Sequence, residues 1–534
     1  MIFATFVGNF VGNFVEKWAD SRQSFRQSSD EAFLGQALNS LSRRPRTMTV
    51  ITKRKTKRMK PINSSTLESL WHDADAREVR LREMVQQQLQ ENPPPSIDDQ
   101  IVASYFLALR TKKLTEIGKE IAYHATSGIK QPRPGSLLAQ CTGQSVGVNE
   151  WDRTGRLGIL HMAYPLKMLL NEHGYLTSCD LLHTTAGAIL FDVYENQDAR
   201  LVRLTIPDHV LKTFPGPAYG ALGLREANGF SADEPALGTI LKPTAGITPD
   251  EVGQLVEQAA RCPLFLFVKE DENLYPHVDY SPVRKRTEKA VAGILRAKES
   301  RGKKDIVFAP HITGSPHEIL DTVHAVLEAG ATGVMFSESF AGGTVRMVRE
   351  ATKDHHHPPA IYGHNAGIGV KTGCIWREVI DLLARLDGID FRQTAPVRPG
   401  KPYIRPYGAE WHASEEVLTG PLPGGIKATM IARAGGLDQG NIILNLQDAE
   451  KRGLTSAILL LAGSAINSIK NSDGIADPQY GAEAMLEALD VHRSGELEGV
   501  SIDEHLAALF ALAEKKTLTA LQDALRQRYG GPSS

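Results

Sequence analysis

The stretch LFLFVKEDENL, residues 264–274, sets an apolar run directly before Lys269, Glu270, Asp271 and Glu272. An apolar run of this length is typical of a strand that is buried on both faces. Seven more strand-like runs lie on either side of it, and most are followed by a helix-length amphipathic segment. They are residues 238–243, 305–312, 332–337, 360–365, 389–396, 429–436 and 457–466.

Eight strands that alternate with helices predict a (β/α)8 TIM barrel, which with its C-terminal helices would cover residues 228–515. The clearest helix start is Thr248-Pro249-Asp250-Glu251, a capping box with proline at the first helical position. A doubly wound open sheet is the alternative architecture. Eight repeats that end without an obvious edge strand favour a closed barrel, and residues 516–534 are expected to form a tail.

Residues 98–227 lack this regular alternation and predict a separate α+β domain of the ferredoxin-like type. Ile101–Leu109, Ala188–Val193 and Arg200–Ile206 are predicted strands, and Leu114–Ala125 is a predicted helix. The overall fold class is therefore α/β, with the barrel as the C-terminal part.

Residues 1–97 are expected to be an extension that is disordered or partly helical, with a helix at Ser65–Glu91. The basic run TKRKTKRMK between residues 52 and 60 is interpreted as a solvated tail rather than as a nucleic-acid or membrane patch. Met48 and Met59 are alternative start positions. No basic residue precedes the apolar beginning of the chain, so a secretory signal is not indicated.

The bulk composition is that of an ordinary globular protein. Of the 534 residues, 42% are hydrophobic and 23% are charged. The formal net charge of −2 argues against a strong overall electrostatic attraction to nucleic acid or membranes. The four cysteines are too scattered for a disulfide framework or a CxxC zinc site. No apolar run approaches the roughly 20 residues that span a bilayer. We therefore expect a cytoplasmic protein with no membrane or specific nucleic-acid partner.

The charged residues after the 264–268 run are candidates for chemistry, since (β/α)8 enzymes react at the carboxyl ends of their strands. Lys269 and Asp271 lie two apart and therefore face the same way, and Glu272 follows in the loop. Two carboxylates suit a hard dication such as Mg²⁺. Two roles are open for Lys269: a buried salt bridge with the acids, or a neutral amine that captures CO2 as an anionic carbamate.

Several of these motifs, in this order, resemble the large subunit of RuBisCO over roughly residues 98–515. They are GTILKP at 238–243, VKEDE at 268–272, the histidine at the end of the fifth strand, and the glycines after the seventh and eighth strands. The resemblance implies that Lys269 is a carbamylated lysine and binds Mg²⁺ together with Asp271 and Glu272. It also implies catalytic roles for Lys242, His364 and Lys401, and phosphate binding by Gly435, Gly436 and Gly463.

The departures from that family concern the groups that serve a bisphosphate and CO2. Thr244 replaces the second lysine of the KPK motif, Asn365 replaces an arginine after the histidine, and the sixth strand has no histidine. Residues 139–144 lack the expected glutamate, and Gly187-Ala188 lacks the expected asparagine. Each lost charge-assisted contact removes about 1.5–3 kcal/mol. The chain therefore resembles the RuBisCO-like proteins of form IV rather than a CO2-fixing enzyme.

The resemblance implies a Mg²⁺-dependent enzyme that forms an enediolate from a phosphorylated ketose or sugar acid, with Lys242 as the proton-transferring base. Arg392 and Arg398 could bind a substrate carboxylate, which favours a decarboxylase of branched sugar-acid phosphates. Alternatives are an enolase or isomerase of methylthio-ribulose phosphate salvage, a non-catalytic scaffold, and an unrelated barrel enzyme with Lys269 as a Schiff-base lysine. The family's active sites are shared between two subunits, which implies a homodimer.

Overall fold

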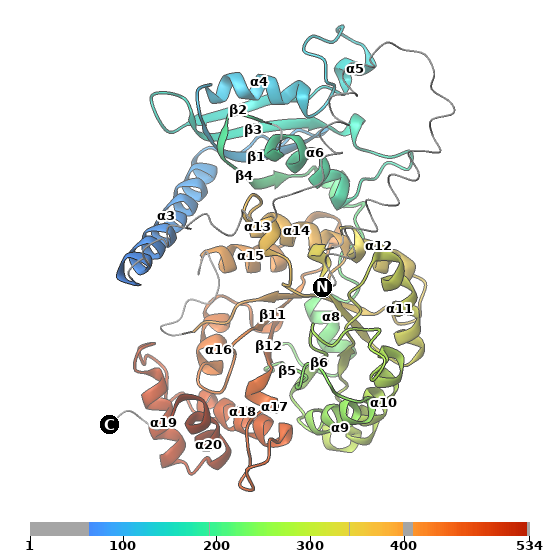
Figure 1. The fold of residues 1–534 in the computed structure, drawn as a ribbon, viewed down its shortest axis with the longest axis vertical. Helices are drawn as coiled ribbons and strands as arrows, with labels where there is room; N and C mark the ends of the chain where they lie inside the picture. The colour runs from blue at the N-terminus through green and yellow to red at the C-terminus, as the bar shows by residue number, and fades with distance from the viewer. Residues whose placement is uncertain (1–63, 192, 341, 399–408, 531–534) are drawn as a thin grey trace, which may run out of the picture. The chain divides into compact units, whose positions relative to one another are not determined.

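The computed structural model describes residues 64–191, 193–340, 342–398 and 409–530 (Figure 1). The basic run, both alternative start residues and Lys401 lie outside these ranges. The first described element is helix α3 (Ser64–Glu91), where a helix was predicted. No helix in the described ranges is long and apolar enough to cross a lipid bilayer.

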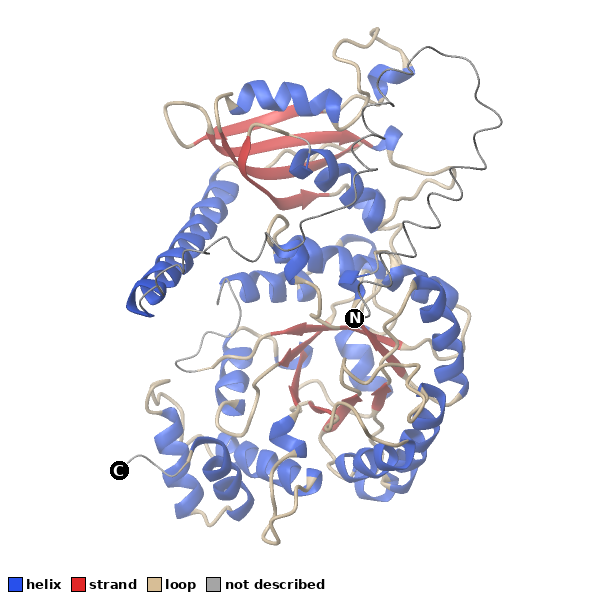
Figure 2. Cartoon of the chain, in the orientation of Figure 1, coloured by secondary structure: helices blue, strands red, loops and turns tan. Residues whose placement is uncertain are grey.

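The N-terminal domain has the ferredoxin-like order of elements, as predicted (Figure 2). Its four strands form an antiparallel sheet in the order β2-β3-β1-β4, and helices α4 and α6 connect β1 to β2 and β3 to β4. The elements are β1 (Gln100–Leu109), α4 (Leu114–His124), α5 (Leu137–Gln140), β2 (Gln144–Glu150), β3 (Leu157–Pro165), α6 (Ser178–Phe191) and β4 (Asn196–Thr205).

One predicted strand of this domain was wrong. Residues 188–191 of the predicted strand Ala188–Val193 form the last turn of helix α6 instead. Leu181, Thr185 and Ile189 on α6 are all fully buried and lie four residues apart. This helical spacing makes one face of α6 part of the domain core. The apolar run AGAIL resembles a strand only when the residues of α6 that precede it are left out.

The C-terminal part is a barrel of eight parallel strands in the order β7-β6-β5-β12-β11-β10-β9-β8, which confirms the predicted architecture. Strands β7 and β8 close it through the single bridge between His311 and Met335. The strands are β5 (Leu237–Ile240), β6 (Phe265–Lys269), β7 (Val307–Ala309), β8 (Gly333–Phe336), β9 (Ala360–Gly363), β10 (Phe391–Thr394), β11 (Met430–Ala434) and β12 (Ile458–Ala462).

Aromatic rings fill the barrel interior and set the direction of the residues above them. The Phe267 ring stacks on the Tyr362 ring with 5.2 Å between centroids, and both side chains are fully buried. Side chains alternate along a strand, so Lys269 and His364, two positions further on, face the same way at the carboxyl ends. The barrel core thus points these two side chains toward the mouth.

Helices separate the barrel strands, and further helices follow the last strand (Figure 1). The capping box at the start of α9 is present, because Thr248 Oγ1 accepts from Glu251 N and the Glu251 carboxylate accepts from Thr248 N. Residues 516–534 include helix α20, whose Leu521 and Leu525 are fully buried. The helices of this part are α7 (Asp208–Leu211), α8 (Gly220–Ala227), α9 (Pro249–Ala260), α10 (Val283–Arg296), α11 (Pro316–Glu328), α12 (Thr344–Ala351), α13 (Gly369–Thr372), α14 (Arg377–Asp387), α15 (Ala409–Thr419), α16 (Ile442–Lys451), α17 (Ser464–Asn467), α18 (Pro478–Arg493), α19 (His505–Lys515) and α20 (Thr519–Tyr529).

Candidate active site

Lys269 is the last residue of β6 and is fully buried. Its Nζ donates to the backbone carbonyl of Glu270 at 3.0 Å and lies 5.5 Å from the centroid of the Tyr362 ring. Its ion pair with a carboxylate is loose, because Glu272 Oε2 lies 3.9 Å from Nζ. Burial lowers the pKa of Lys269 to about 8, although Glu272 and Asp271 act in the opposite direction.

Glu270 faces away from the barrel interior and has a structural role. It is fully buried and forms a two-point ion pair with Arg286 of α10, at 2.6 Å (Nε to Oε1) and 2.9 Å (Nη2 to Oε2). Its Oε2 also accepts from the backbone N–H of His311 at 2.8 Å. One of the three carboxylates therefore fastens β6 to α10 and β7, and the other two remain for the mouth.

Asp271 links the first two strands of the barrel. Its Oδ2 pairs with Nζ of Lys242, which follows β5, and its Oδ1 accepts from the backbone and side-chain N–H groups of Asn273 at 3.0 and 2.9 Å. Burial is the largest single influence on the pKa of Asp271 and raises it, but the hydrogen bonds from Lys242 and Asn273 and the charges of Lys242 and Lys269 together hold this pKa below its ordinary value. A Cβ on Gly463 would lie 3.6 Å from Lys242 Cε, so the lysine stem passes this glycine.

Glu272 meets His364, which follows β9. His364 Nε2 lies 3.3 Å from Glu272 Oε2, and His364 Nδ1 accepts from the backbone N–H of Ala366 at 3.1 Å. Because Nδ1 accepts, the proton of the neutral ring is on Nε2, which can donate to Glu272. Burial, and then the charge on Lys269, lower the pKa of His364 to about 2, so the ring is neutral. The predicted residues Lys242, Lys269 and His364 thus each pair with one of the two predicted carboxylates, Asp271 or Glu272.

These residues fit a hard dication. Asp271 and Glu272 offer carboxylate oxygens, which Mg²⁺ prefers over nitrogen ligands. No three His, Cys, Asp or Glu side chains in the described ranges form a metal-binding group, so a third anionic oxygen would have to come from another residue type. A pKa near 8 gives Lys269 a neutral fraction, and its amine could supply that oxygen as a carbamate.

The structure does not bring Arg392 to the mouth. Arg392 follows the inward-facing Phe391 on β10 and therefore faces the surrounding helices, where it is fully buried. Its Nε donates to Asp381 of α14 at 2.6 Å, and its Nη1 pairs with Glu338. Asp381 and Glu338 therefore bind the guanidinium that was expected to bind a substrate carboxylate.

His311 and Arg433 are satisfied inside the protein. The ring nitrogens of His311 lie 3.0 Å from the Leu274 carbonyl and 2.6 Å from Thr313 Oγ1, and burial lowers its pKa to about 4. Arg433 forms a two-point pair with Glu415 of α15, both contacts at 3.0 Å. In the described ranges neither side chain hydrogen-bonds to Asp271 or Glu272, although the charges of Lys269 and Asp271 act on His311.

Two further residues of the mouth, Asn273 and Gln393, were assigned no role from the sequence. Asn273 fixes Asp271 through the two hydrogen bonds described above. Gln393 faces inward on β10, two positions after Phe391, and its Oε1 lies 3.4 Å from both the Tyr362 hydroxyl and the Asn365 backbone nitrogen. Alternation from Phe391 could have identified Gln393, whereas nothing in the sequence marks Asn273 apart from its nearness to Asp271.

The glycines expected to bind phosphate follow β11 and β12. Gly435 and Gly436 have φ angles of 89° and 96°, which favour glycine. A Cβ on Gly436 would lie 2.5 Å from Arg398 Nη1, so this guanidinium rests against the glycine backbone. Asn467 Nδ2 donates at 2.9 Å to both the Gly463 and the Ile240 carbonyls, joining the ends of β12 and β5.

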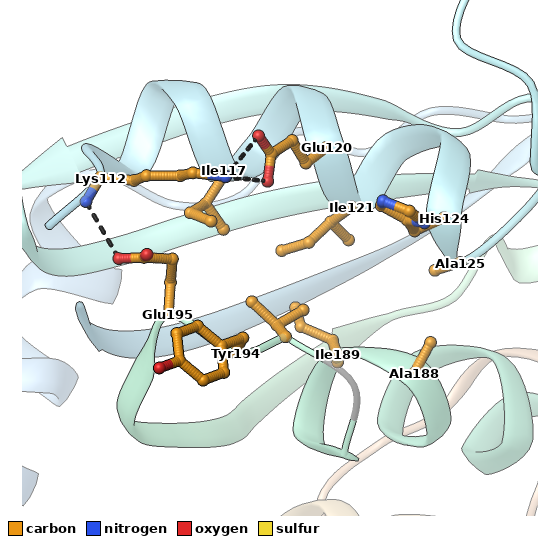
Figure 3. A pocket seen from close by; sticks show the side chains of 11 residues that line it. Lys112, Ile117, Glu120, Ile121, His124, Ala125, Ala188, Ile189, Tyr194 and Glu195 are labelled. Carbon is orange, nitrogen blue, oxygen red and sulfur yellow. Dashed lines mark hydrogen bonds and ion pairs between the residues drawn. The ribbon is translucent and has the colours of Figure 1, made fainter. Parts of the chain in front are cut away.

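A separate cavity of about 190 Å³ lies in the N-terminal domain (Figure 3). The apolar side chains of Ile117 and Ile121 from α4 face Ile189 from α6, and Lys112 is paired with Glu120 at the edge. None of the mouth residues lines this cavity. Its size is below that of an ordinary ligand site of roughly 300–1,000 Å³.

Residues 225–402 match the family model of the ribulose bisphosphate carboxylase large chain, catalytic domain. This segment contains Lys242, the KEDE sequence and His364. A rubisco-like protein (MtnW) from Alicyclobacillus acidocaldarius has a similar structure, with a TM-score of 0.65 and 25% sequence identity. The superposition covers 81% of this chain and 100% of that one.

Two curated relatives are named as a transcarboxylase/hydrolase and as a decarboxylase. The 3-oxo-isoapionate-4-phosphate transcarboxylase/hydrolase of Xanthobacter autotrophicus is 33% identical over 195 residues, which are 36% of this chain and 45% of that protein. The 3-oxo-isoapionate-4-phosphate decarboxylase of Rhizobium rhizogenes is 31% identical over 176 residues, which are 33% of this chain and 41% of that protein. The chain thus matches less than half the length of each relative.

Proposed function

The chain belongs to the RuBisCO large-chain family through its barrel, and on that premise we propose that it is a RuBisCO-like enzyme acting on a phosphorylated sugar acid. The proposed reaction is the loss of CO2 to give an enediolate, not the fixation of CO2. The observation that carries the proposal is the fully buried Lys269 beside the Glu272 carboxylate, with a second lysine held on the neighbouring Asp271.

Mg²⁺ would be held by oxygen atoms of Asp271, Glu272 and a carbamate on Lys269, with at least one oxygen from each. When bound, this ion would polarise a substrate carbonyl as a Lewis acid. The neutral His364 ring would keep its Nε2 proton toward Glu272 and orient that carboxylate, because Ala366 fixes the other ring nitrogen. The low pKa of His364 supports a role as a hydrogen-bond donor rather than as a base.

Lys242 is the proposed proton-transferring group. About a third of its side chain is exposed, whereas Lys269 is fully covered, so Lys242 is the lysine that a substrate in the mouth can reach. Its ammonium group is paired with Asp271, and acting as a base requires that it give up this contact and a proton. As an ammonium it can instead donate a proton to a developing enolate.

One phosphate group would bind at the glycine loops after β11 and β12. The positive φ angles of Gly435 and Gly436 favour a loop whose N–H groups converge on an anion. Arg398 adds a guanidinium beside Gly436. Arg392, which could have bound a second anion, is used by Asp381 and Glu338. A monophosphate therefore fits better than a bisphosphate.

Decarboxylation is preferred over isomerisation because of the two relatives named for 3-oxo-isoapionate 4-phosphate. Loss of CO2 from a 3-oxo acid leaves an enolate, which is the same kind of intermediate that proton abstraction from a ketose gives. The chemistry of the mouth is compatible with either route to this intermediate. An enolase or isomerase of methylthio-ribulose phosphate is therefore the second candidate.

We also propose a homodimer in which each mouth is completed by the partner. Large apolar side chains are exposed on the segments that follow the carboxyl ends of the strands, where water covers them in a single chain. They are Tyr275 after β6, Phe340 after β8, Val370 after β9 and Ile475 after β12. A second subunit that covers this rim would remove these surfaces from water and exclude water from the site.

The test is a panel that contains 3-oxo-isoapionate 4-phosphate and methylthio-ribulose phosphate, assayed with Mg²⁺ and bicarbonate. CO2 release and exchange of a substrate proton with deuterium are measured separately. We expect CO2 release from the sugar acid, abolished in Lys269→Ala and unchanged in Lys289→Ala, an exposed lysine. If neither reaction occurs and Lys269→Ala alters only stability, the chain is a scaffold. Trapping by borohydride without Mg²⁺ would indicate a Schiff base instead.

A further inference from the structure

The loop between β11 and α16, residues 435–441, is fastened internally and to the helices α17, α18 and α20. Asn441 stabilises it internally, because its Nδ2 donates to the Gly436 carbonyl at 2.9 Å and its Oδ1 accepts from Asp438 N at 3.1 Å. Gln439 reaches α17, which starts directly after Gly463, and α18, because its Nε2 donates to the Ala465 carbonyl at 2.7 Å and to the Gly481 carbonyl at 3.2 Å. The two glycine loops of the proposed phosphate site are therefore joined to each other.

The loop also contacts the last turn of the last described helix, α20. Asp438 is almost fully buried, and its carboxylate accepts from Arg528 Nε at 3.1 Å and from the Tyr529 hydroxyl at 2.7 Å. The same carboxylate accepts from the backbone N–H of Gly440 at 3.0 Å. Residues about 90 positions apart in the sequence thus share one buried carboxylate.

Gly440 permits this contact. A Cβ at position 440 would lie 2.6 Å from Cε2 of the Tyr529 ring, closer than any side chain can approach. The ring therefore rests directly on the loop backbone, and its hydroxyl reaches Asp438 from there. The loop and the end of α20 fit together through both packing and a charged hydrogen-bond network.

We propose that Arg528 and Tyr529 are positioning residues that hold the Gly435-Gly436 loop in the conformation that binds the substrate's phosphate. The proposal rests on the proposed function, because it assumes that this loop binds an anion. The two residues hold the Asp438 carboxylate toward the Gly440 N–H. Asn441 bonds to both the Asp438 backbone N–H and the Gly436 carbonyl, so the position of Asp438 also fixes that of Gly436. Neither residue is proposed to touch the phosphate.

The experiment measures binding of inorganic phosphate to the full chain by titration calorimetry at 25 °C. The variants are Tyr529→Phe, Arg528→Gln and the double variant, and hydrogen exchange of residues 435–441 is followed in each. We expect roughly tenfold weaker phosphate binding in the double variant, as for other residues that orient a ligand-binding group, and a smaller loss in each single variant. Arg528→Lys should recover part of the affinity.

Two controls separate positioning from general stability. Arg526→Gln removes a surface arginine of the same helix that lies 3.4 Å from Glu514, and it should bind phosphate as the wild type does. Leu525→Val removes a buried methylene of α20 without touching Asp438, and it should lower the thermal midpoint but keep the phosphate affinity. Parallel losses of affinity and stability in all the α20 variants would overturn the positioning role.

The outcomes also distinguish this inference from the proposed function. If the wild type binds phosphate and the double variant binds it equally well, the positioning role is wrong and the proposed function stands. If the wild type binds no phosphate up to millimolar concentration, the phosphate site of the proposed function is overturned, and the inference that depends on it is overturned as well.

Discussion

Arg286 and Glu270 form a fully buried two-point ion pair directly behind the strand that carries Lys269. Glu270 also receives the His311 backbone N–H, and Arg286 donates to the Leu274 carbonyl at 3.2 Å. The pair thereby ties β6, β7, α10 and the loop after β6 together. It fixes the register of β6, because a one-residue shift of this strand would turn Lys269 and Asp271 away from the mouth.

Breaking this pair should be costly. Arg286→Gln leaves the Glu270 carboxylate buried without its ion partner, and we expect a loss of about 3–5 kcal/mol in the free energy of unfolding. Chemical denaturation of the apo protein measures it. Arg284→Gln on the same helix is the matched control, since Arg284 is half exposed and should cost less than about 1 kcal/mol. Equal effects of the two substitutions would refute the structural role of the pair.

Carbamate formation on Lys269 should increase with pH. Burial lowers the pKa of Lys269 from 10.5 to about 8, and only the neutral amine captures CO2. The neutral fraction is then roughly a tenth at pH 7 and roughly nine-tenths at pH 9. At a fixed concentration of dissolved CO2, a carbamate signal in carbon-13 NMR should rise steeply between these values. The same signal should be absent in Lys269→Ala and present in Lys289→Ala; no dependence on Lys269 would exclude the carbamate.

The fold was predictable because its signals are local. The apolar run 264–268, its seven counterparts and the capping box at Thr248 each follow from side-chain periodicity or helix-start chemistry, and the structure contains all of them. The strand predicted at Ala188–Val193 was wrong because a short apolar run is ambiguous, and only the burial of Leu181 and Thr185 upstream assigns it to a helix.

The candidate site was predictable where alternation along one strand sufficed. It placed Lys269 and Asp271 together, and the resemblance added Lys242 and His364. Alternation applied to β10 would also have turned Arg392 outward, but Arg392 was considered only for the ability of a guanidinium to bind a carboxylate. The contact of Asp438 with Arg528 and Tyr529 could not be predicted, because it joins residues far apart in sequence through the packing of α20.

His364 should remain neutral throughout the range in which enzymes of this kind are assayed. Burial and the Lys269 charge lower its pKa to about 2, so protonation of the folded protein at this residue is not expected above pH 4. Nitrogen-15 NMR of labelled histidine should show the tautomer with the proton on Nε2 from pH 5 to pH 8. His364→Gln identifies the signal. An imidazolium signal for His364 at pH 6 would contradict the assigned donor role toward Glu272.

The proposed dimer should depend on the apolar rim of the mouth. Phe340 is 68% exposed on the loop after β8, and a charge placed there would have to be buried against the partner. We expect Phe340→Glu to shift the protein from dimer to monomer in sedimentation velocity and to lower turnover without changing the thermal midpoint by more than a few degrees.

Leu295 supplies the matched control for this prediction. It is 62% exposed but lies in the last turn of α10, which runs away from the mouth, so Leu295→Glu should leave the sedimentation coefficient and the turnover unchanged. Dissociation by both variants would place the contact elsewhere on the barrel. A wild-type protein that sediments as a monomer at micromolar concentration, with full turnover, would show that one chain completes its own mouth and would exclude a site shared between subunits.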